Sequence, residues 1–302
     1  MKRKITFILI CGFFIISCQK EKEPDELNWV SYSDFFTRDY IRTMVIDSND
    51  NKWIGTDDGL YRFNNSDWVF YDERNSIRAI TIDKQGIKWI GSVNLFAEST
   101  VGVSTFNNEE WILKIDDYSA HAIAIDKEGQ KWIGNIHAEL LKFYNDSLTV
   151  FPKKYINNRG ISITSIAIDS DDNKWICSDN GILIFDKNES WTIINDTIFA
   201  TSVVIDLNNN IWIGSSKGLL MFDGNTWTVY NSADGLINDI INTIVIDDAG
   251  NKWIGTIDGL SRFDNNNWES YLSGESITAL AIDTNGELWV GALDKLLKCN
   301  AF

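Results

Sequence analysis

The stretch INTIVIDDAGNKWIGTIDGLSRFD, residues 241–264, is the clearest copy of a unit that recurs along the chain. Each copy places an aspartate six residues before a tryptophan, as Asp247 precedes Trp253 here. The unit occurs seven times, with its tryptophan at Trp53, Trp89, Trp132, Trp175, Trp212, Trp253 and Trp289. These tryptophans are 36, 43, 43, 37, 41 and 36 residues apart. A period of this length is typical of propellers in which each repeat forms one four-stranded blade.

The first unit shows how one blade divides into strands. Residues 41–46 alternate as a half-buried strand does, and a turn rich in Asp and Asn follows them. Three more short β-forming runs, residues 52–56, 60–63 and 68–71, are separated by further turns. No stretch after residue 27 has a convincing helical period. We therefore predict an all-β fold, a seven-bladed β-propeller with four-stranded blades.

The thirteen tryptophans predict how the ring closes. Seven belong to the unit above, and six others open the fourth strand of a blade: Trp29, Trp68, Trp111, Trp191, Trp227 and Trp268. Blade three has Leu148 instead, and the seventh unit ends after three strands. The segment NWVSY, residues 28–32, matches the missing outer strand of blade seven, and pairing it there would cover an exposed sheet edge. We predict packing roles for these tryptophans, with ligand stacking as the alternative for any single one.

The N-terminus has the pattern of an export signal. Residues 2–4 are cationic, and a largely apolar run over 5–16 is too short to span a hydrocarbon core of ~30 Å. The sequence IISC, residues 15–18, resembles the lipobox of bacterial lipoproteins, which implies that Cys18 is a lipid anchor. Ordinary secretion with cleavage nearby is the alternative. We expect a lipoprotein signal peptide at 1–17, a charged tether at 18–27 and the propeller at 28–302.

The tether and the overall charge indicate location and partners. The stretch QKEKEPDE after Cys18 resembles the charged segment of surface lipoproteins of Bacteroidetes, which implies the outer membrane and leaves its surface and periplasmic sides open. The formal net charge is −16, and removal of the signal makes it more negative. Such a charge argues against binding of nucleic acid or anionic lipid headgroups. We expect a monomer that meets the membrane through its lipid anchor alone.

The repeated unit resembles the two-component regulator propeller repeat over essentially residues 28–298. In that family, such propellers form the periplasmic ligand-binding part of hybrid histidine kinases that sense oligosaccharides, together with a second propeller, a β-sandwich, a membrane span and a kinase. These additional parts do not occur within the 302 residues. The resemblance implies a non-catalytic exported lipoprotein that binds an oligosaccharide or another extracellular ligand. A protein-docking platform at the cell envelope is the alternative.

One face of the predicted propeller carries all the variation in loop length. The variation lies in the loop after the second strand of blade two and in three connections between blades, which open on the same face. Variable loops on a rigid scaffold are where binding residues concentrate. The second residue of each inner strand should lie near the channel mouth on this face: Arg42, Arg78, His121, Thr164, Thr201, Asn242 and Thr278.

Arg42, Arg78 and His121 form a basic arc on three neighbouring blades of an otherwise acidic protein. We expect this arc to bind a carboxylate or sulfate of a glycan or peptide, because a guanidinium can grip such a group with two parallel hydrogen bonds. The further candidate residues lie in the variable loops: Tyr40, Phe96, Tyr155 and Arg159. In the alternative interpretation, the arginines pair with acids of neighbouring loops and hold these loops still, the candidates being Asp39, Glu73 and Asp117.

Catalytic and metal chemistry have little support in the sequence. The two histidines, His121 and His137, belong to no recognised catalytic motif. Asp169 begins a turn that superficially resembles a calcium loop, but Lys174 stands where that loop needs glycine. We expect turn-forming aspartates, no metal, no cofactor and no enzymatic activity. Because streptogramin lyases, another seven-bladed group, place a catalytic histidine at the channel mouth, a lyase that uses His121 is a further alternative.

The cysteines left in the propeller, Cys177 and Cys299, lie on blades three apart in the ring. A disulfide needs Cα atoms about 5–6 Å apart. We therefore expect two buried free thiols.

Overall fold

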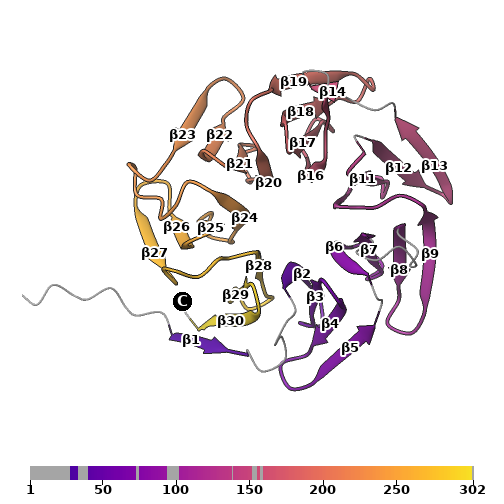
Figure 1. Cartoon of the computed structure of the whole chain (residues 1–302), viewed down its shortest axis with the longest axis horizontal. Coiled ribbons are helices and arrows are strands. Elements are labelled where there is room, and N and C mark those ends of the chain that lie inside the picture. Colours follow the sequence, from indigo (N-terminus) through magenta and orange to yellow (C-terminus); the bar gives the residue numbers. More distant parts are fainter. Residues whose placement is uncertain are drawn as a thin grey trace, which may run out of the picture.

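The computed structural model describes residues 28–32, 40–72, 75–93, 102–137, 139–151, 155–156 and 159–300. Seven antiparallel sheets of four strands surround a central axis (Figure 1), and no helix occurs within these ranges. The predicted all-β, seven-bladed propeller is therefore confirmed. Within the same ranges, no helix is long and apolar enough to cross a membrane.

In blades one to six the four strands run in sequence from the axis outward (Figure 1). Blades one to three contain β2(Ile41–Ile46), β3(Lys52–Thr56), β4(Gly59–Phe63) and β5(Trp68–Asp72); β6(Ser76–Ile82), β7(Lys88–Val93), β8(Gly102–Phe106) and β9(Trp111–Asp116); β10(Ala122–Ile125), β11(Lys131–Gly134), β12(Leu140–Tyr144) and β13(Ser147–Phe151). Blades four and five contain β16(Ile163–Ile168), β17(Lys174–Ser178), β18(Gly181–Phe185) and β19(Trp191–Asn195); β20(Ala200–Ile205), β21(Ile211–Ser215), β22(Gly218–Phe222) and β23(Trp227–Tyr230). Blades six and seven contain β24(Ile241–Ile246), β25(Lys252–Thr256), β26(Gly259–Phe263) and β27(Trp268–Tyr271); β28(Ala279–Ile282), β29(Leu288–Ala292), β30(Lys295–Asn300) and β1(Asn28–Ser31).

Blade seven draws its outer strand from the start of the chain. The strand order β1-β30-β29-β28 places the first and last strands side by side (Figure 1). Trp29 lies opposite Cys299, and the amide of Tyr32 donates a hydrogen bond of 2.8 Å to the carbonyl of Leu296. Trp29 packs against the buried cluster that also holds Trp253 of blade six. The predicted closure and the packing role of Trp29 are confirmed.

Neighbouring blades lie in close contact at the glycine of the repeated unit. A Cβ atom on Gly134 would lie 2.2 Å from Cγ2 of Ile163 in the next blade, so a larger residue cannot fit without movement. Blade four has Cys177 at this position, and the next inner strand begins with Ala200 in place of isoleucine. The larger residue is thus matched by a smaller partner. Cys177 and Cys299 are buried free thiols, as predicted.

The seven repeated aspartates connect each first hairpin to its tryptophan. Oδ1 of Asp47 accepts hydrogen bonds of 3.0 Å from the amides of Asn49 and Asn51, which confirms the predicted turn role. Oδ2 accepts a hydrogen bond of 2.8 Å from Nε1 of Trp53. The corresponding indole bond occurs in all seven blades at 2.8–3.0 Å. The constant spacing of six residues therefore preserves a side-chain bond as well as a turn.

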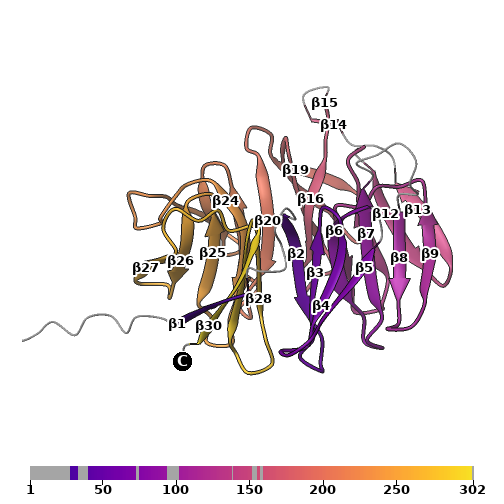
Figure 2. The ribbon, with the colours of Figure 1, turned by 60° about the horizontal axis from the view of Figure 1, so that its bottom comes forward.

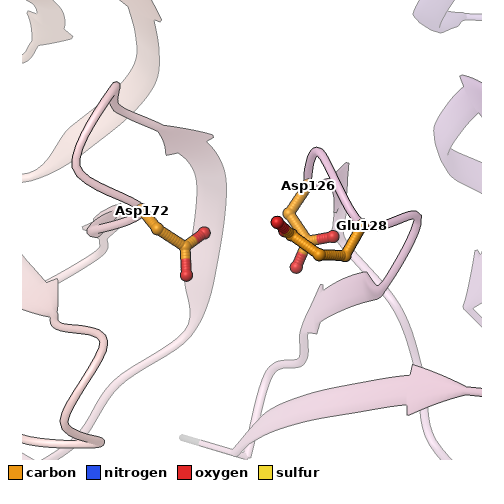
Figure 3. Close-up of side chains that lie close together, drawn as sticks. All are labelled: Asp126, Glu128 and Asp172. Carbon is orange, nitrogen blue, oxygen red and sulfur yellow. The ribbon is translucent and has the colours of Figure 1, made fainter.

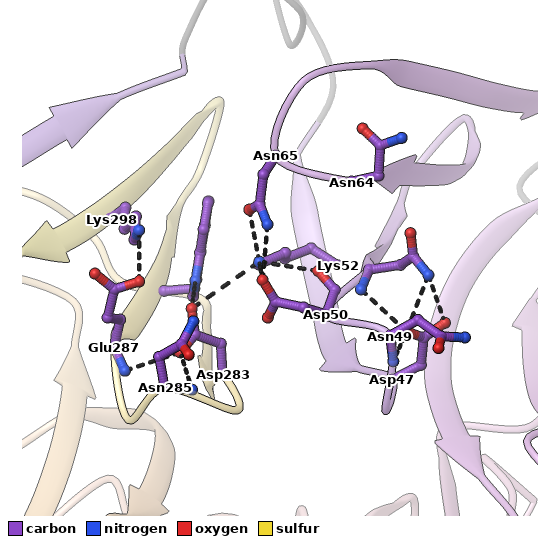
Figure 4. A network of polar contacts seen from close by, with 12 residues as sticks. Asp47, Asn49, Asp50, Lys52, Asn64, Asn65, Asp283, Asn285, Glu287 and Lys298 are labelled. Atoms are coloured by element: carbon purple, nitrogen blue, oxygen red, sulfur yellow. Dashed lines mark hydrogen bonds and ion pairs between the residues drawn. The ribbon is translucent and has the colours of Figure 1, made fainter.

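A lysine before the tryptophan, buried in four blades and half-buried in blade three, crosses five of the seven blade junctions. Its ammonium lies over the indole of the preceding blade, 4.3–4.5 Å from the ring centroid: Lys52 on Trp289, Lys88 on Trp53, Lys131 on Trp89, Lys174 on Trp132 and Lys252 on Trp212. In Figure 4 the Nζ of Lys52 donates to Asp50 Oδ2 at 2.8 Å and to Asn65 Oδ1 at 2.7 Å. Hydrogen bonds therefore compensate the burial of this charge.

The connection between blades three and four forms a small hairpin that the sequence did not predict. Its strands are β14(Tyr155–Ile156) and β15(Arg159–Gly160), with Tyr155 paired to Gly160. Figure 2 shows the hairpin rising beyond one face of the ring. The backbone of Tyr155 and Arg159 is thus placed on a projecting element of the face predicted to be variable.

Candidate functional site

A β-bulge in the inner strand directs selected side chains toward the axis. In blade one, Ile41 pairs with Thr56 and Thr43 pairs with Gly55, which leaves Arg42 between them unpaired. A bulge bends the strand and can re-aim the side chain of its extra residue. The same break in register occurs at Arg78, Thr164, Thr201 and Asn242. In blades three and seven, His121 and Thr278 immediately precede the inner strand instead.

The seven positions meet around one cavity of about 230 Å³. Its lining includes Arg42, Arg78, His121, Thr164, Thr201, Asn242 and Thr278. The structure therefore brings together the side chains that the sequence placed at the channel mouth.

In blades four to six the polar lining residue bonds to the next blade, and in blade seven it bonds within its own blade. Each of these side chains donates a hydrogen bond to a backbone carbonyl: Thr164 to Ala200 at 2.7 Å, Thr201 to Ile241 at 2.8 Å, Asn242 to Ile277 at 2.9 Å and Thr278 to Gly291 at 3.1 Å. These donors are occupied by the fold. The groups best suited to meet a ligand therefore lie on blades one to three.

Asp57, in the loop between β3 and β4, is the acid that holds the arginines. Arg42 donates to it in a bidentate arrangement, with Nε to Oδ1 at 2.9 Å and Nη2 to Oδ2 at 2.6 Å. Arg78 Nη2 lies 3.4 Å from Oδ1, and Ser76 Oγ donates to the same oxygen at 2.9 Å. Burial opposes the charge of Asp57, but these donors and the two positive charges outweigh it and lower its pKa.

The expected alternative, in which loop acids pair with the arginines, is correct in kind, but the acid that the structure shows, Asp57, was not among those named. The described ion pairs of Arg42 and Arg78 both end on Asp57, not on Asp117. Asp39 and Glu73 lie outside the described residues. Sequence reasoning missed Asp57 because acids are frequent in every loop and spacing alone does not select one. The feature that could have pointed to Asp57 is its position in the loop nearest to both arginines.

Arg78 is only partly neutralised. Two guanidinium groups share the single carboxylate of Asp57, and Arg42 holds it by the shorter, bidentate contact. The Nε atom of Arg78 is buried and has no hydrogen-bond partner within the described part of the chain. Burial, followed by the charge of Arg42, lowers the pKa of Arg78. The group nevertheless stays charged at neutral pH, so among the described residues of blades one and two the two arginines outnumber the one acid that pairs with them.

His121 lines this side of the cavity, and Tyr40 lies against Arg42 outside the lining. Burial, with a smaller contribution from Arg78, lowers the pKa of His121 to about 4, so its imidazole is neutral at neutral pH. A neutral imidazole offers one hydrogen-bond donor and one acceptor. The ring centroid of Tyr40 lies 5.4 Å from Cζ of Arg42, and its side chain is 46% exposed. The structure thus adds an accessible aromatic ring to the basic arc.

Several expected site residues lie outside the described residues or are described only in their backbone. Phe96 and the proposed lipid anchor Cys18 lie outside the described residues, as do 1–17 and the tether at 18–27. Tyr155 and Arg159 are described in their backbone, on the projecting hairpin.

An acidic group on the blade three and blade four turns resembles a metal-binding arrangement (Figure 3). Ligand oxygens of Asp126, Glu128 and Asp172 lie within 4.8 Å of one another. Lys174 Nζ lies 2.8 Å from Asp172 Oδ2 and already supplies a positive charge there. Asp169, singled out by its likeness to a calcium loop, accepts turn amides from Asp171 and Asn173 at 2.9 Å. Asp126 likewise accepts hydrogen bonds from the amide of Gln130 and the indole of Trp132, so the buried aspartates of both turns already have partners.

Comparisons with known proteins agree with this architecture. The fold is similar to a streptogramin B lyase (TM-score 0.77, 11% identity, covering 91% of this chain and 97% of that one). It is similar to virginiamycin B lyase from Staphylococcus aureus (TM-score 0.74, 14% identity, covering 92% of this chain and 100% of that one). It is also similar to an extracellular domain assigned to a hybrid two component system of B. thetaiotaomicron (TM-score 0.75, 16% identity, covering 91% of this chain and 40% of that one). This chain spans well under half of that domain. No curated protein matches the chain.

The family described as two component regulator propeller matches residues 271–294. This segment contains Asp283 and Trp289, the aspartate and tryptophan of the seventh repeated unit. The same unit builds the other six blades, with the same indole bond in each. The chain is therefore a seven-bladed propeller, and the repeated unit of its seventh blade matches the two component regulator propeller family.

Proposed function

We propose that this protein is an exported propeller that binds an anionic extracellular ligand at the axial cavity. The observation that carries the proposal is the shared carboxylate of Asp57, which leaves Arg78 partly unpaired beside a cavity of about 230 Å³. In the proposed complex, a ligand carboxylate or sulfate takes up the free donors of Arg78. Hydrogen bonds between a guanidinium and such an anion are stronger than those between neutral groups.

The neighbouring residues give this site its shape. Asp57 holds the guanidinium of Arg42 in a fixed orientation, so the N–H groups of Arg42 outside this pair are presented without further ordering. Neutral His121 can donate to or accept from a hydroxyl, and Tyr40 offers an exposed ring. A ring face beside polar donors suits a sugar that carries an acid group. The ligand class we propose is therefore an acidic oligosaccharide, with Phe96, Tyr155 and Arg159 of the variable loops as further candidate contacts.

The proposed location follows from the export signal. We place the mature chain at the cell envelope, anchored through lipid on Cys18 at the outer membrane, with the surface and periplasmic sides open. The pattern of residues 1–18 and the likeness to an extracellular domain from B. thetaiotaomicron support this placement. Metabolic labelling with a radioactive fatty acid tests it. Label should enter the wild-type protein and be absent from Cys18→Ala, and label in both would exclude this anchor.

Calorimetric titration tests the proposed ligand class. The protein is titrated with acidic oligosaccharides, with neutral oligosaccharides of the same backbone and with acidic peptides. Arg78→Gln should weaken binding of the acidic sugars at least tenfold and leave binding of neutral ones unchanged. Arg262→Gln is the matched control, because Arg262 pairs with Glu269 on the outer strands of blade six. Equal affinity of wild type and Arg78→Gln for every binder found would exclude the basic arc as the binding site.

A lyase that uses His121 is the second candidate function. It is favoured by the position of His121 in the cavity and by the likeness of the fold to two lyases. We place it second because a general base works best with a pKa near the working pH, and the pKa of His121 is about 4. Incubation with uronic-acid polysaccharides tests it through the absorbance of unsaturated products. Product formed by wild type and lost in His121→Ala would establish catalysis.

A docking platform is the remaining alternative. Rigid propeller rims present many loops, and such folds host unrelated binding functions. Pull-downs from envelope extracts test it, with Arg78→Gln alongside wild type. A protein retained by both forms, together with no sugar binding in the calorimeter, would favour docking over the anion site.

A further inference from the structure

The blade junctions are filled by a recurring set of three aromatic rings. At the junction of blades one and two, the ring centroids of Trp53 and Phe106 lie 5.7 Å apart. Phe106 stacks on Trp111, which opens the outer strand β9, with 4.8 Å between their ring centroids. The same set occurs at four further junctions: Trp289, Phe63 and Trp68; Trp132, Phe185 and Trp191; Trp175, Phe222 and Trp227; Trp212, Phe263 and Trp268. The outer-strand tryptophan thus covers the phenylalanine of its own blade.

The junction of blades two and three lacks the third ring. The ring centroids of Trp89 and Phe143 lie 5.6 Å apart, as their counterparts do elsewhere. Phe143 pairs in register with Leu148, at the position that Trp68 and Trp111 occupy opposite their phenylalanines. Leu148 is 37% exposed and does not belong to the buried cluster that holds Trp89 and Phe143. The ring face of Phe143 is therefore left without the indole that covers it in other blades.

The opposite wall of this junction also lacks a ring. In blade one, Tyr71 lies opposite Leu60 and contacts Phe106 of blade two, with 5.0 Å between ring centroids. The corresponding residue of blade two, opposite Val103, is Ile115. An aliphatic side chain fills less of the junction than a phenol ring does. Two departures from the repeat therefore coincide at the same place.

A mainly apolar groove of about 270 Å³ lies at this junction, and we call it the blade-three slot. Its apolar lining comprises Ile87, Trp89, Ile112, Phe143 and Tyr144. Lys114 and Asp146 also line it and are paired with each other at 3.3 Å, so this part of the lining has little net charge. Lys131 lies over Trp89, 4.4 Å from its ring centroid. The slot thus suits a flat apolar ring better than a charged group.

We propose that the blade-three slot is a docking site for a tryptophan side chain of a partner protein. The occupant follows from the fold, because at five other junctions the corresponding place beside the phenylalanine holds an indole. A polypeptide fits better than a free ring, since exposed apolar side chains continue beyond the slot on β9 and β13. These are Leu113 and Val150. Partner anchors that fill apolar pockets are commonly tryptophan.

A peptide titration followed by saturation-transfer NMR and calorimetry tests the proposal. The probe is a neutral eight-residue peptide with one central tryptophan, compared with the same peptide carrying alanine there. Wild-type protein should bind the tryptophan peptide at least tenfold more tightly than the alanine peptide. Leu148→Trp should fill the slot from within and abolish the difference. Val150→Trp, which adds an indole on the same strand away from the slot lining, should preserve it.

Further measurements keep the test decisive if Leu148→Trp folds poorly. Tyr144→Ser changes a largely exposed lining residue and should weaken binding of the tryptophan peptide at least threefold. Equal binding of both peptides, or tryptophan-dependent binding that Leu148→Trp and Tyr144→Ser leave unchanged, would overturn the proposal. So would preferential binding of a neutral oligosaccharide at the slot. Arg78→Gln should leave peptide binding unchanged, which separates this site from the axial cavity.

Discussion

Trp29 lies directly opposite Cys299, so the first and last strands of the chain share one sheet. This pairing predicts that Trp29 stabilises the whole ring. Trp29→Ala should lower the free energy of unfolding by about 2 kcal/mol, below the range for a fully buried tryptophan because Trp29 is half-buried. Val30→Ala, at an exposed neighbour, is the control. Urea unfolding measures both, and equal losses in the two variants would contradict a closing role for Trp29.

The contact between Gly134 and Ile163 predicts a compensating pair of substitutions. Gly134→Ala alone should cost roughly 1–3 kcal/mol, since its Cβ would meet Ile163. Ile163→Ala alone should cost about 2–5 kcal/mol through the cavity it leaves. The double variant reproduces the arrangement of Cys177 and Ala200, so its loss should be smaller than the sum by at least about 1 kcal/mol. Strictly additive losses in urea unfolding would show that the two positions do not interact.

The indole bonds of the turn aspartates predict sensitivity to acid. The pKa of Asp206 lies below 3.8 in the folded chain, because hydrogen bonds from Trp212 and the turn outweigh the opposing effect of burial. The unfolded chain therefore binds more protons as the pH falls, so the stability from this group is present above about pH 4 and is lost as the pH falls through the depressed pKa. The pKa values of Asp47 and Asp283 are also lowered, so the stability from these groups is lost in the same direction of pH.

Asp206→Asn tests this assignment. The variant should be less stable than wild type at pH 7 and should lose less of its remaining stability between pH 5 and pH 3. Urea unfolding at several pH values measures both quantities. Asp264→Asn is the control for an exposed turn aspartate that lacks an indole partner among its described bonds. An unchanged pH profile in Asp206→Asn would contradict the assignment.

The proximity of Arg78 to His121 predicts a coupled titration. Burial is the larger cause of the low pKa of His121, and the positive charge of Arg78 lowers it further. Arg78→Gln should therefore raise the pKa of His121 above 4 but leave it below 6.5. NMR titration of the imidazole protons measures this shift, and Arg262→Gln provides the control. A pKa of His121 that does not respond to Arg78→Gln would contradict the described geometry of the arc.

The fold could be predicted from the sequence because each blade repeats the same packing problem. The constant sequence spacing between Asp47 and Trp53, and between the corresponding residues of the other units, identified the blades. The strand at Trp29, which belongs to no complete unit of its own, indicated how the ring closes. The side chains around the cavity were also predictable, since equivalent positions of a closed ring must converge. The ion pairs that these side chains form could not be predicted from the sequence. Asp57 belongs to a loop whose path depends on the whole structure, and the departure at Leu148 was visible in the sequence although the groove that it leaves was not.

The shared sheet of blade seven also has a consequence for the order of events during synthesis. The strand at Asn28–Ser31 is among the first parts of the propeller to be made, and its partner at Lys295–Asn300 is the last. Domains made on the ribosome generally begin folding from their N-terminal side. Here the earliest strand must wait, with its edge unsatisfied, until translation of the entire ring is complete. The circle therefore closes only after all seven blades have been made.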